Sequence, residues 1–598
     1  MPSKSVAIRY TSREYATIKS DLIEFAKRYY PDTFQDFNEA SFGALMLDSV
    51  AYIGDMLSFY LDYQVNESFL DSALEFNNVL KIGRQLGYKW DGHPSSYGDV
   101  TLYAMIPANS TGLGPDTRYI PVLKKNTTFG GAGSWLLMED VDFANSSNEV
   151  VVGKINESTG IPTHYAIRAY GRIVSGQYYS KTINIGSFTR FRKVRVGPSG
   201  ISEVLSVKDS AGNDYYEVEH LSQDVVYKAI TNTNADKELV TSVLKPVLVP
   251  RRFTLERGGN SMFLQFGYGS ESEITKGSIP DPRDVVLDMH AKEYITDREL
   301  DPSKLTSSDK FGISPSDTDL TIVYRANMPG QTTAAAGSIK KVSVPRTKFT
   351  DEHLLSDSQM STVRGSIEVS NEEPITGISP NLDTVELKRK ILGHFAAQNR
   401  AVTKQDYLAL VYTMPSRYGS VKRANILRDP DSFKRNLNLY VIGQDTAGKL
   451  ASLTDTAKEN MKVWLNQKRM ISDTIDILDA KVINYAIEFE VSPKFESDSA
   501  TVLSRCLQAI KDAYVGPNKA LDIAEPVYIS KVYSILNKVE GVQDTKKVKI
   551  VPRTGGVYSE MTFNFKSQTS PDGRYISVPE NCIMELKYGN LDVQGTVK

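Results

Sequence analysis

Histidine and cysteine residues are too scattered in this chain to form the common catalytic and metal-binding motifs. The 598 residues include six histidines, none in an H-E-x-x-H pair, and two cysteines, Cys506 and Cys582, which lie far apart. The strong zinc signatures require close spacing, because the ligands must converge on one ion. The sequence therefore predicts no metal and no cofactor, and the two cysteines predict no disulfide framework.

Glycine-rich and acidic stretches also favour turns over catalysis. The chain has no G-x-S-x-G elbow and no G-x-x-x-x-G-K-[ST] loop. "FGYGS", residues 266–270, lacks the third glycine and following helix of a phosphate cradle, so a tight turn is preferred. "DSAGNDYYE" lacks EF-hand spacing. We expect no catalytic residues, although the 72 Asp and Glu residues leave a glycosidase-type carboxylate pair open, since such a pair is defined in space.

One basic and aromatic run, "FTRFRKVRVG" at residues 188–197, is a candidate docking strand. As a strand it places Arg190 and Arg192 on one face and Lys193 and Arg195 on the other. Docking against an acidic protein surface, or simple solvation of a strand edge, is favoured over nucleic-acid binding. The run is short, and the whole chain has a net charge of -2.

Length and composition predict a multidomain globular protein. A chain of 598 residues exceeds one core and suggests roughly three or four domains. Charged residues make up 24% and hydrophobic residues 40%, as in ordinary globular proteins. No basic segment followed by an apolar one begins the chain, so we expect no signal peptide and folding in a reducing cytosol.

Residues 1–95 read as helical, and the stretch from Phe42 to Tyr63 is unusually apolar. Asp48, Asp55 and Asp62 recur every seven residues and form one stripe, assigned to the outermost, water-facing position. Three carboxylates argue against a membrane span. The helix therefore requires partners on two or more sides, and its candidate interface positions, with those of the preceding helix, are Tyr15, Ile18, Leu22, Phe25, Tyr29, Val50, Ile53, Leu57 and Tyr60.

The flanking segments complete this helical region. "TSRE" at residues 11–14 has the form of a capping box that opens the first helix. "SFLD", from Ser68, is expected to open a third helix running towards Gly87. The partners of the central helix are either other chains or residues 15–29 and 70–86 in an intrachain three-helix bundle.

The rest of the chain changes character twice. Residues 96–350 alternate or run β-branched between turns, with a loop-rich excursion near 279–319. Residues 351–598 mix helices with strands, including a capping box at Thr403 and Asp406. The expected class is multidomain α+β, with an N-terminal helical bundle segment, a β-rich middle and a mixed α/β C-terminal region.

The order of these segments resembles the baseplate J-like family of contractile tails. Within it, the chain resembles the large ring-forming wedge subunit of T4-like phages. The resemblance is carried by "NESF" and "LGY" in the helical part, by "QFGYG", by "RAVTKQDYLALV", and by the later "NLYVIG" and "DAKVINYAIEFEV". The matching positions are Asn66, Glu67, Phe69, Gly87, Phe266, Gly267, Gly269, Arg400, Val402, Thr403, Asp406 and Tyr407.

The resemblance implies a structural, non-enzymatic virion protein of the tail baseplate, assembled in the host bacterial cytoplasm. It implies wedge subunits that pair with a second copy, contact other wedge subunits, and form a ring near the central hub that rearranges on contraction. No small-molecule substrate, nucleic acid or membrane is implied. A tail-associated carbohydrate-active hydrolase is the alternative function, followed by a nucleic-acid-binding module.

Residues 351–598 are also expected to self-associate. Family likeness is one motive, and "TIDILDAKVINYAIEFEV" is the other. It predicts two consecutive strands whose edges would be exposed unless another chain covers them.

Overall fold

The computed structural model describes most of the chain and divides it into two compact units. One unit comprises residues 1–88 with 383–391, and the other comprises 89–382 with 392–598. The described residues are 14–32, 41–90, 92, 94–131, 133–198, 200–232, 242–258, 261–270, 311–327, 332–377, 383–432, 436–445, 447–495, 497–516 and 519–598. Thr11 of the predicted capping box, and most of the predicted excursion near 279–319, lie outside these ranges.

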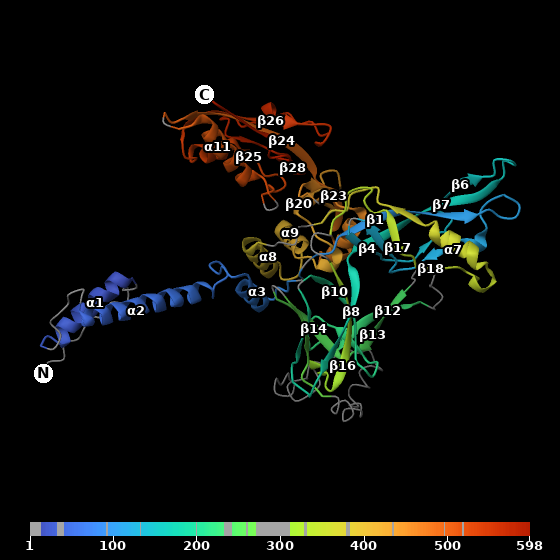
Figure 1. The fold of residues 1–598 in the computed structure, drawn as a ribbon, viewed down its shortest axis with the longest axis horizontal. Coiled ribbons are helices and arrows are strands. Elements are labelled where there is room, and N and C mark those ends of the chain that lie inside the picture. The colour runs from blue at the N-terminus through green and yellow to red at the C-terminus, as the bar shows by residue number, and fades with distance from the viewer. Residues whose placement is uncertain are drawn as a thin grey trace. The chain divides into compact units, whose positions relative to one another are not determined.

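The first unit consists of helices. They are α1 (Tyr15–Tyr29), α2 (Phe42–Asn66), α3 (Phe76–Gln85) and the beginning of α8 (Thr384–Ala397). α1 packs along α2 (Figure 1), and α3 packs on α8, where a Cβ on Gly83 would lie 2.8 Å from the Ile391 side chain. The α3–α8 contact therefore depends on glycine at this position.

The turn between α2 and α3 is organised by one carboxylate. Glu67 Oε1 accepts hydrogen bonds from the backbone N–H of Leu74 at 2.7 Å and of Glu75 at 3.3 Å, and its Oε2 accepts one from Asn78 Nδ2 at 3.0 Å. The third helix expected to run towards Gly87 is present, but its expected start at Ser68 is wrong, because Glu67 holds the connection in place and the helix begins at Phe76.

The β-rich middle begins with an antiparallel sheet. Its strand order is β17-β3-β4-β7-β1-β19, with β6 added beside β7. The buried faces of these strands and helix α7 (Asp357–Gly365) form a continuous core around Trp135, Phe129 and Phe349. The strands are β1 (Tyr97–Pro107), β3 (Thr128–Gly131), β4 (Gly133–Leu137), β6 (Glu149–Ile155), β7 (Pro162–Ser175), β17 (Lys341–Val344) and β19 (Glu368–Ser370), beside the small sheet of β2 (Val122–Leu123), β5 (Val141–Asp142) and β18 (Thr347–Lys348).

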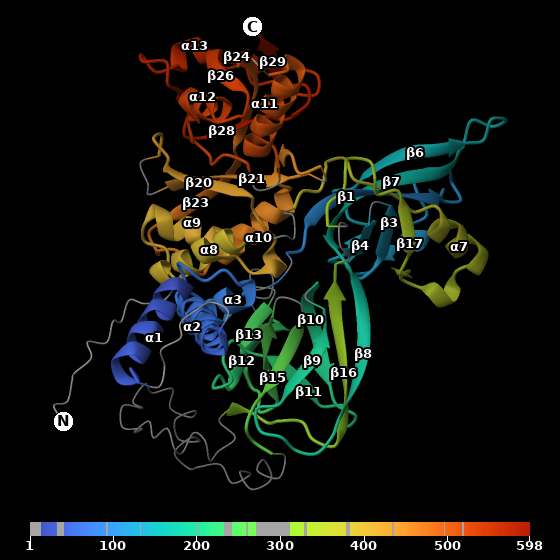
Figure 2. The same ribbon diagram turned by 60° about the vertical axis from the view of Figure 1, so that its left-hand side comes forward.

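The second part of the middle is a strongly curled seven-stranded sheet (Figure 2). Its order is β8-β16-β10-β11-β14-β15-β9, and Lys181 Nζ on the first strand donates a hydrogen bond to the Val196 carbonyl on the last at 2.7 Å. This side-chain bridge brings the two ends together. The strands are β8 (Gln177–Ile185), β9 (Lys193–Gly197), β10 (Ile201–Lys208), β11 (Asp214–Glu217), β14 (Arg252–Arg257), β15 (Met262–Phe266) and β16 (Thr318–Ala326), with a separate hairpin of β12 (Val225–Thr231) and β13 (Ser242–Leu248).

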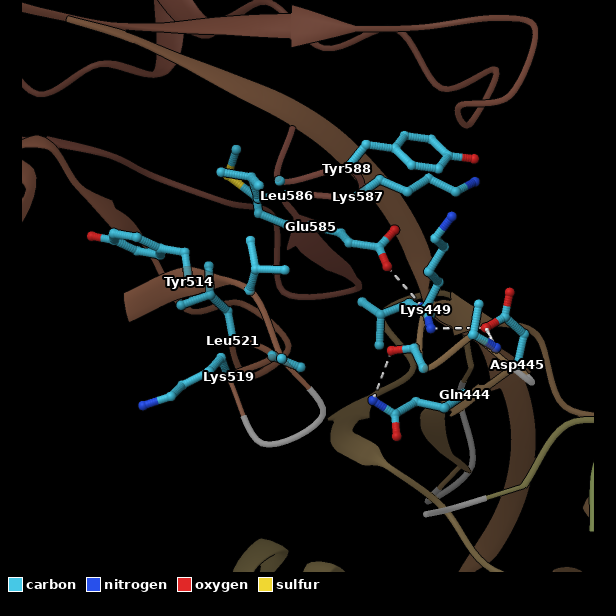
Figure 3. A pocket seen from close by; sticks show the side chains of 18 of the residues that line it. Gln444, Asp445, Lys449, Tyr514, Lys519, Leu521, Glu585, Leu586, Lys587 and Tyr588 are labelled. Carbon is cyan, nitrogen blue, oxygen red and sulfur yellow. Dashed lines mark hydrogen bonds between the residues drawn. The ribbon is translucent and has the colours of Figure 1, made fainter. Parts of the chain in front are cut away.

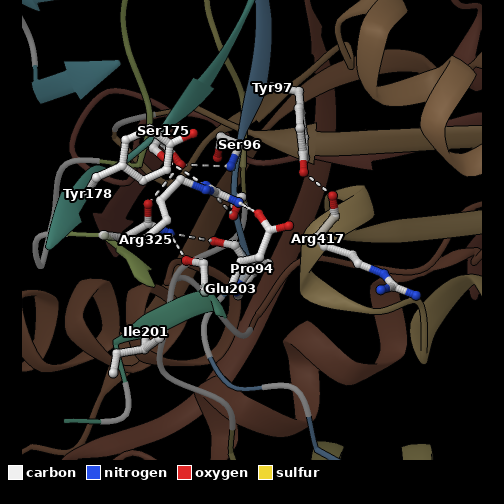
Figure 4. A network of polar contacts seen from close by, with 12 residues as sticks. Pro94, Ser96, Tyr97, Ser175, Tyr178, Ile201, Glu203, Arg325 and Arg417 are labelled. Carbon is white, nitrogen blue, oxygen red and sulfur yellow. Dashed lines mark hydrogen bonds and ion pairs between the residues drawn. The ribbon is translucent and has the colours of Figure 1, made fainter. Parts of the chain in front are cut away.

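A buried arginine joins the two middle sheets (Figure 4). Arg325 at the end of β16 donates to the Ser175 carbonyl at the end of β7 at 2.6 Å and to Ser95 Oγ at 2.9 Å. Its Nη2 lies 3.2 Å from Glu203 Oε2 on β10. Asn327 Nδ2 adds bonds to the Pro94 carbonyl and to Ser202. The joint is polar, so its geometry is set by directional bonds.

The C-terminal region contains two α/β layers. In the first, β21 pairs with β20, β22 and β23 and is covered by α9 and α10. In the second, β24 pairs with β26 on one side and with β28 and β29 on the other, under α11 and α12. The elements are α9 (Lys404–Tyr412), β20 (Arg423–Arg428), β21 (Asn436–Gln444), β22 (Leu450–Ala451), α10 (Asp455–Asn466), β23 (Thr474–Asp479), β24 (Lys481–Pro493), α11 (Ser499–Tyr514), β25 (Val527–Tyr528), α12 (Ile529–Asn537), β26 (Val542–Arg553), α13 (Phe565–Gln568), β27 (Tyr575–Ile576), β28 (Cys582–Glu585) and β29 (Val593–Val597).

The predicted multidomain α+β class is confirmed by this architecture. The two strands predicted in "TIDILDAKVINYAIEFEV" are also present as β23 and β24. The expectation that they leave exposed edges is wrong for β24, since it is a central strand with neighbours on both sides. Its alternate residues, including Ile483, Tyr485 and Phe489, are buried in the core.

Replacement of Arg325 by Met is expected to lower the stability of the middle region by about 2 to 3 kcal/mol, because charged hydrogen bonds in a buried site are lost. Arg172→Met is the control, since Arg172 makes a half-exposed ion pair with Glu459 at 2.7 Å and such pairs contribute at most about 1 kcal/mol. Differential scanning fluorimetry of both variants provides the measurement. Equal melting temperatures for the two variants would contradict a special role for Arg325.

Candidate interface of the N-terminal helices

α1 contacts the side of α2 that carries its smallest residues. Ala44 and Ala51 are the two buried residues of α2. A Cβ on Gly54 would lie 3.4 Å from Ile18 Cδ1, so Ile18 rests directly on the glycine. Residues 44, 51, 54 and 58 recur at helical spacing and are Ala, Ala, Gly and Ser. Small residues let two helix backbones approach closely, which explains why this side receives α1.

An ion pair fixes the same contact. Lys19 Nζ on α1 lies 2.6 Å from Asp48 Oδ1 on α2, and this ammonium holds the pKa of Asp48 below its usual range. The assignment of Asp48 to the water-facing stripe is therefore wrong. The acidic and small-residue side of α2 faces α1, because the paired carboxylate and the missing side chains both favour close packing there.

The opposite side of α2 is apolar and exposed. Val50, Ile53, Leu57 and Tyr60 are 52%, 55%, 58% and 57% exposed. Of the predicted interface residues on α1, Ile18 and Leu22 are half-buried, whereas Tyr15, Phe25 and Tyr29 are exposed. Further large apolar side chains continue the open surface: Leu45, Met46, Tyr52, Phe59, Leu61 and Val65. An intrachain three-helix bundle is absent among the described residues of this unit.

Helix α2 is long and apolar enough to span a membrane, but it carries charges that oppose insertion into one. α2 is the one described helix that is long and apolar enough, with a mean hydropathy of 1.2. Asp48, Asp55 and Asp62 lie along it, and a carboxylate at the centre of a bilayer costs about 2.5 to 3.5 kcal/mol on insertion scales. The exposed apolar side is therefore better suited to a protein partner than to lipid.

Four of the positions that carry the family resemblance lie between the end of α2 and the residues just after α3. Asn66 closes α2, and its carbonyl accepts a hydrogen bond from Ser72 Oγ at 2.6 Å. Glu67 is the buried carboxylate of the turn, and Phe69 is exposed. Gly87 follows α3 with φ +85, a left-handed conformation that glycine adopts without strain. Asn66 and Phe69 are both exposed, and Phe69 is the one of the four that offers a partner a large apolar side chain.

The "QFGYG" positions lie in the curled sheet and have a packing role. Phe266 is buried beside Phe253 and Tyr215. A Cβ on Gly267 would lie 2.1 Å from the carbonyl oxygens of both Phe311 and Gly312. The Gly269 N–H donates to the Gly312 carbonyl at 3.0 Å. The glycines thus allow a second backbone segment to pass directly over the end of β15.

The remaining family-like positions form the start of α9. The predicted capping box is present: Thr403 Oγ1 accepts from the Asp406 N–H, and Asp406 Oδ2 accepts from the N–H groups of Thr403 and Val402. Tyr407 is buried and donates to Asp473 Oδ2 at 2.8 Å. Arg400 and Val402 precede the helix on the surface. These residues therefore define a local fold and not a reactive site.

The predicted docking strand is shorter than expected. β9 begins at Lys193, because Phe191 has φ +50 and cannot continue an extended strand. Arg190 instead lies over the Tyr268 ring at 4.4 Å, and Arg192 donates to Thr189 Oγ1 at 3.0 Å. Lys193 pairs with Glu256 at 2.8 Å. Arg195 is exposed on β9. Lys193 and Arg195 therefore share the exposed face of β9 as predicted, whereas Arg190 and Arg192 lie outside the strand.

A pocket of about 760 Å³ lies between the two C-terminal layers (Figure 3). Burial raises the pKa of Glu585, one of the residues that line the pocket. Glu585 Oε1 accepts from the Leu450 N–H at 2.8 Å, and Oε2 accepts from Asn484 Nδ2 at 2.9 Å. Lys449 Nζ lies 3.6 Å from the centre of the Tyr588 ring. The carboxylate therefore braces β22 against β24, and among the described residues no cluster of three potential metal ligands is present.

Comparison with known proteins singles out the helical unit. Residues 14–85 match the family model of the bacteriophage baseplate protein N-terminal domain. The match supports a structural protein of the phage baseplate. It covers α1, α2 and α3, so the surface that the chain leaves open lies within the matched segment.

The other comparisons add less. No curated protein matches the chain. Among solved structures, one chain of the anti-feeding prophage baseplate is similar; that baseplate was determined by cryo-electron microscopy with six-fold symmetrisation. The alignment covers 69% of this chain and 76% of the matched chain, with 12% sequence identity and a TM-score of 0.25. This TM-score is too low to equate the two folds.

Enlarging a buried residue between α1 and α2 is expected to separate the two helices. Ala51→Leu should destabilise their contact by about 1 to 3 kcal/mol, because overpacking forces backbone shifts, whereas Val50→Leu on the exposed side should change little. Hydrogen exchange of the α1 amides measures the difference. Unchanged protection in Ala51→Leu would show that α1 does not pack on the small-residue side.

The turn held by Glu67 is expected to weaken in acid. Hydrogen bonds from the Leu74 N–H and from Asn78 hold the pKa of Glu67 below its usual range. Its contribution is therefore complete above the ordinary carboxyl pKa of about 4.3 and is lost as pH falls through the lower folded value. Protection factors of Leu74 and Glu75, corrected for intrinsic exchange, should fall below about pH 4. Glu67→Gln should remove this pH dependence, whereas Glu24→Gln, at an exposed site on α1, should retain it.

Proposed function

We propose that this chain is a wedge subunit of the baseplate of a contractile-tailed phage. In this role it pairs with a second copy, contacts other wedge subunits, and contributes to a ring around the central hub that rearranges when the tail contracts. The observation that carries the proposal is the open apolar side of α2, within the segment that matches the baseplate domain. The protein would be a component of the virion tail, assembled in the host cytoplasm.

The energetics favour a partner over water. Fully burying a Leu, Ile or Phe side chain is worth roughly 1.5 to 3 kcal/mol. Val50, Ile53, Leu57 and Tyr60 lie on one side of α2, and each is more than half exposed. A helix from another chain laid along them would extend the α1–α2 pair into a bundle, with α1 already occupying the small-residue side. Soluble monomers rarely leave an apolar patch of this extent uncovered.

The self-association proposed for residues 351–598 now has a different basis. β24 is fully paired and does not provide the surface. Among the described strands β23 pairs with β21 alone, so the proposal of a contact between neighbouring copies through this region depends on the family resemblance and on the other edge of β23.

The proposed contact of α2 with another chain can be tested by introducing two negative charges on its exposed apolar side. Ile53→Asp combined with Leu57→Asp should lower the oligomer mass of the purified full chain, or abolish its co-purification with co-expressed baseplate subunits, while far-UV circular dichroism stays unchanged. Tyr170→Asp, an exposed aromatic site on β7, is the matched control. If the double variant assembles like the wild type, the side of α2 carrying Ile53 and Leu57 is not the interface.

A further inference from the structure

The strand β6 is an open sheet edge with exposed β-branched side chains. It pairs with β7 on one side, and no described strand pairs with its other edge. All seven of its residues are exposed, and Val151 is 52% exposed. Figure 1 shows the β6–β7 hairpin projecting from the rest of its sheet. A valine-rich edge without proline pairs readily with other strands, so a native protein covers it or blunts it.

A bulge decides which β6 side chains share a face. Val152 lies opposite Tyr165 and Lys154 lies opposite His164, so Gly153 is an extra residue in the strand. A Cβ on Gly153 would lie 3.3 Å from the Ala166 nitrogen, which suits glycine at this position. Because of the bulge, Lys154 falls on the same face as Glu149 and Val151, whereas Val150 and Val152 lie on the other.

This arrangement makes the edge complementary to itself. When two copies of β6 run antiparallel with Val151 opposite Val151, each Glu149 lies opposite the other copy's Lys154. On the other face, each Val150 lies opposite the other copy's Val152, and each Gly153 bulge falls between matched pairs. Opposite charges and β-branched pairs directly across an antiparallel ladder are both stabilising. An unbulged strand would place Glu149 and Lys154 on different faces and lose this match.

We propose that β6 pairs with β6 of a second copy of this chain, about a two-fold axis through Val151. A symmetric contact of this kind uses the same patch on both partners, as the charge pattern requires. One pair of short strands buries less than the roughly 1,000 Å² typical of a stable interface. The contact is therefore weak in the free protein and strengthens when copies are held together by other surfaces. The inference does not depend on the proposed baseplate function.

Disulfide trapping of the full chain maps the register. The native Cys506 and Cys582 are buried, so crosslinking between chains is expected only through an introduced surface thiol. In Val151→Cys the two thiols lie directly opposite, within the 4.4 to 6.8 Å Cα separation that disulfides require. In Val152→Cys the two thiols lie two residues out of register, with their Cα atoms about 8 Å apart.

With diamide as oxidant, Val151→Cys should form the disulfide-linked dimer at least about ten-fold faster than Val152→Cys does. A mixture of Val150→Cys and Val152→Cys should form the heterodimer. Equal rates for Val151→Cys and Val152→Cys, or no dimer, would overturn the proposal.

A charge exchange in the Val151→Cys background separates this pairing from non-specific sticking. Glu149→Lys alone places Lys opposite Lys, and Lys154→Glu alone places Glu opposite Glu, so each variant should crosslink several-fold more slowly with itself. Mixed together, each Lys of one chain meets a Glu of the other, and the heterodimer, resolved by mass spectrometry, should form at the original rate. A mixture no faster than the separate variants would show that the edge is covered by something other than a second β6.

Discussion

The packing of α1 on the small-residue side of α2 determines which surface the N-terminal unit leaves open. Ala44, Ala51 and Gly54 allow the two backbones to approach, and the Lys19–Asp48 pair orients them. Once α1 occupies that side, Val50, Ile53, Leu57 and Tyr60 have no partner in the described part of the unit. A helix this long and this apolar is therefore expected to gain stability from a further partner along its open side.

Elsewhere the chain relies on buried polar groups at its joints. Arg325 connects the two middle sheets, Glu67 holds the turn between α2 and α3, and Glu585 braces β22 against β24. Arg325 and Glu585 meet directional partners from segments far apart in the chain, whereas the partners of Glu67 follow it closely in the sequence. Such joints specify geometry more strictly than apolar contacts, because a misplaced partner leaves a buried polar group unsatisfied. Such defined joints would suit the proposed wedge subunit, whose surfaces would have to match those of its neighbours.

Strand edges also differ in whether the chain covers them. The curled sheet brings its two ends together through Lys181, and β24 is enclosed by β26, β28 and β29. β6 is treated differently, since its apolar residues remain exposed and its charges are arranged for symmetric pairing. Among the described residues, the apolar side of α2 and the outer edge of β6 are therefore two surfaces that the chain leaves open.

The sequence by itself determined the elements and their class. Periodicity and capping residues predicted α9, β23 and β24, and the multidomain α+β architecture, because these signals are local. It also indicated that α2 needs partners on several sides. Tertiary structure decided which side receives α1, because the preference of Asp48 for water is reversed by Lys19 on another helix. It likewise decided that β24 is central, because the strands that flank it come from other segments of the chain. The late start of α3 is a local effect that the sequence pattern did not show, since Glu67 bonds to Leu74 and Asn78 just after it. The match of Glu149 with Lys154 on one face of β6 depends on a bulge, which is visible only once β6 is paired with β7.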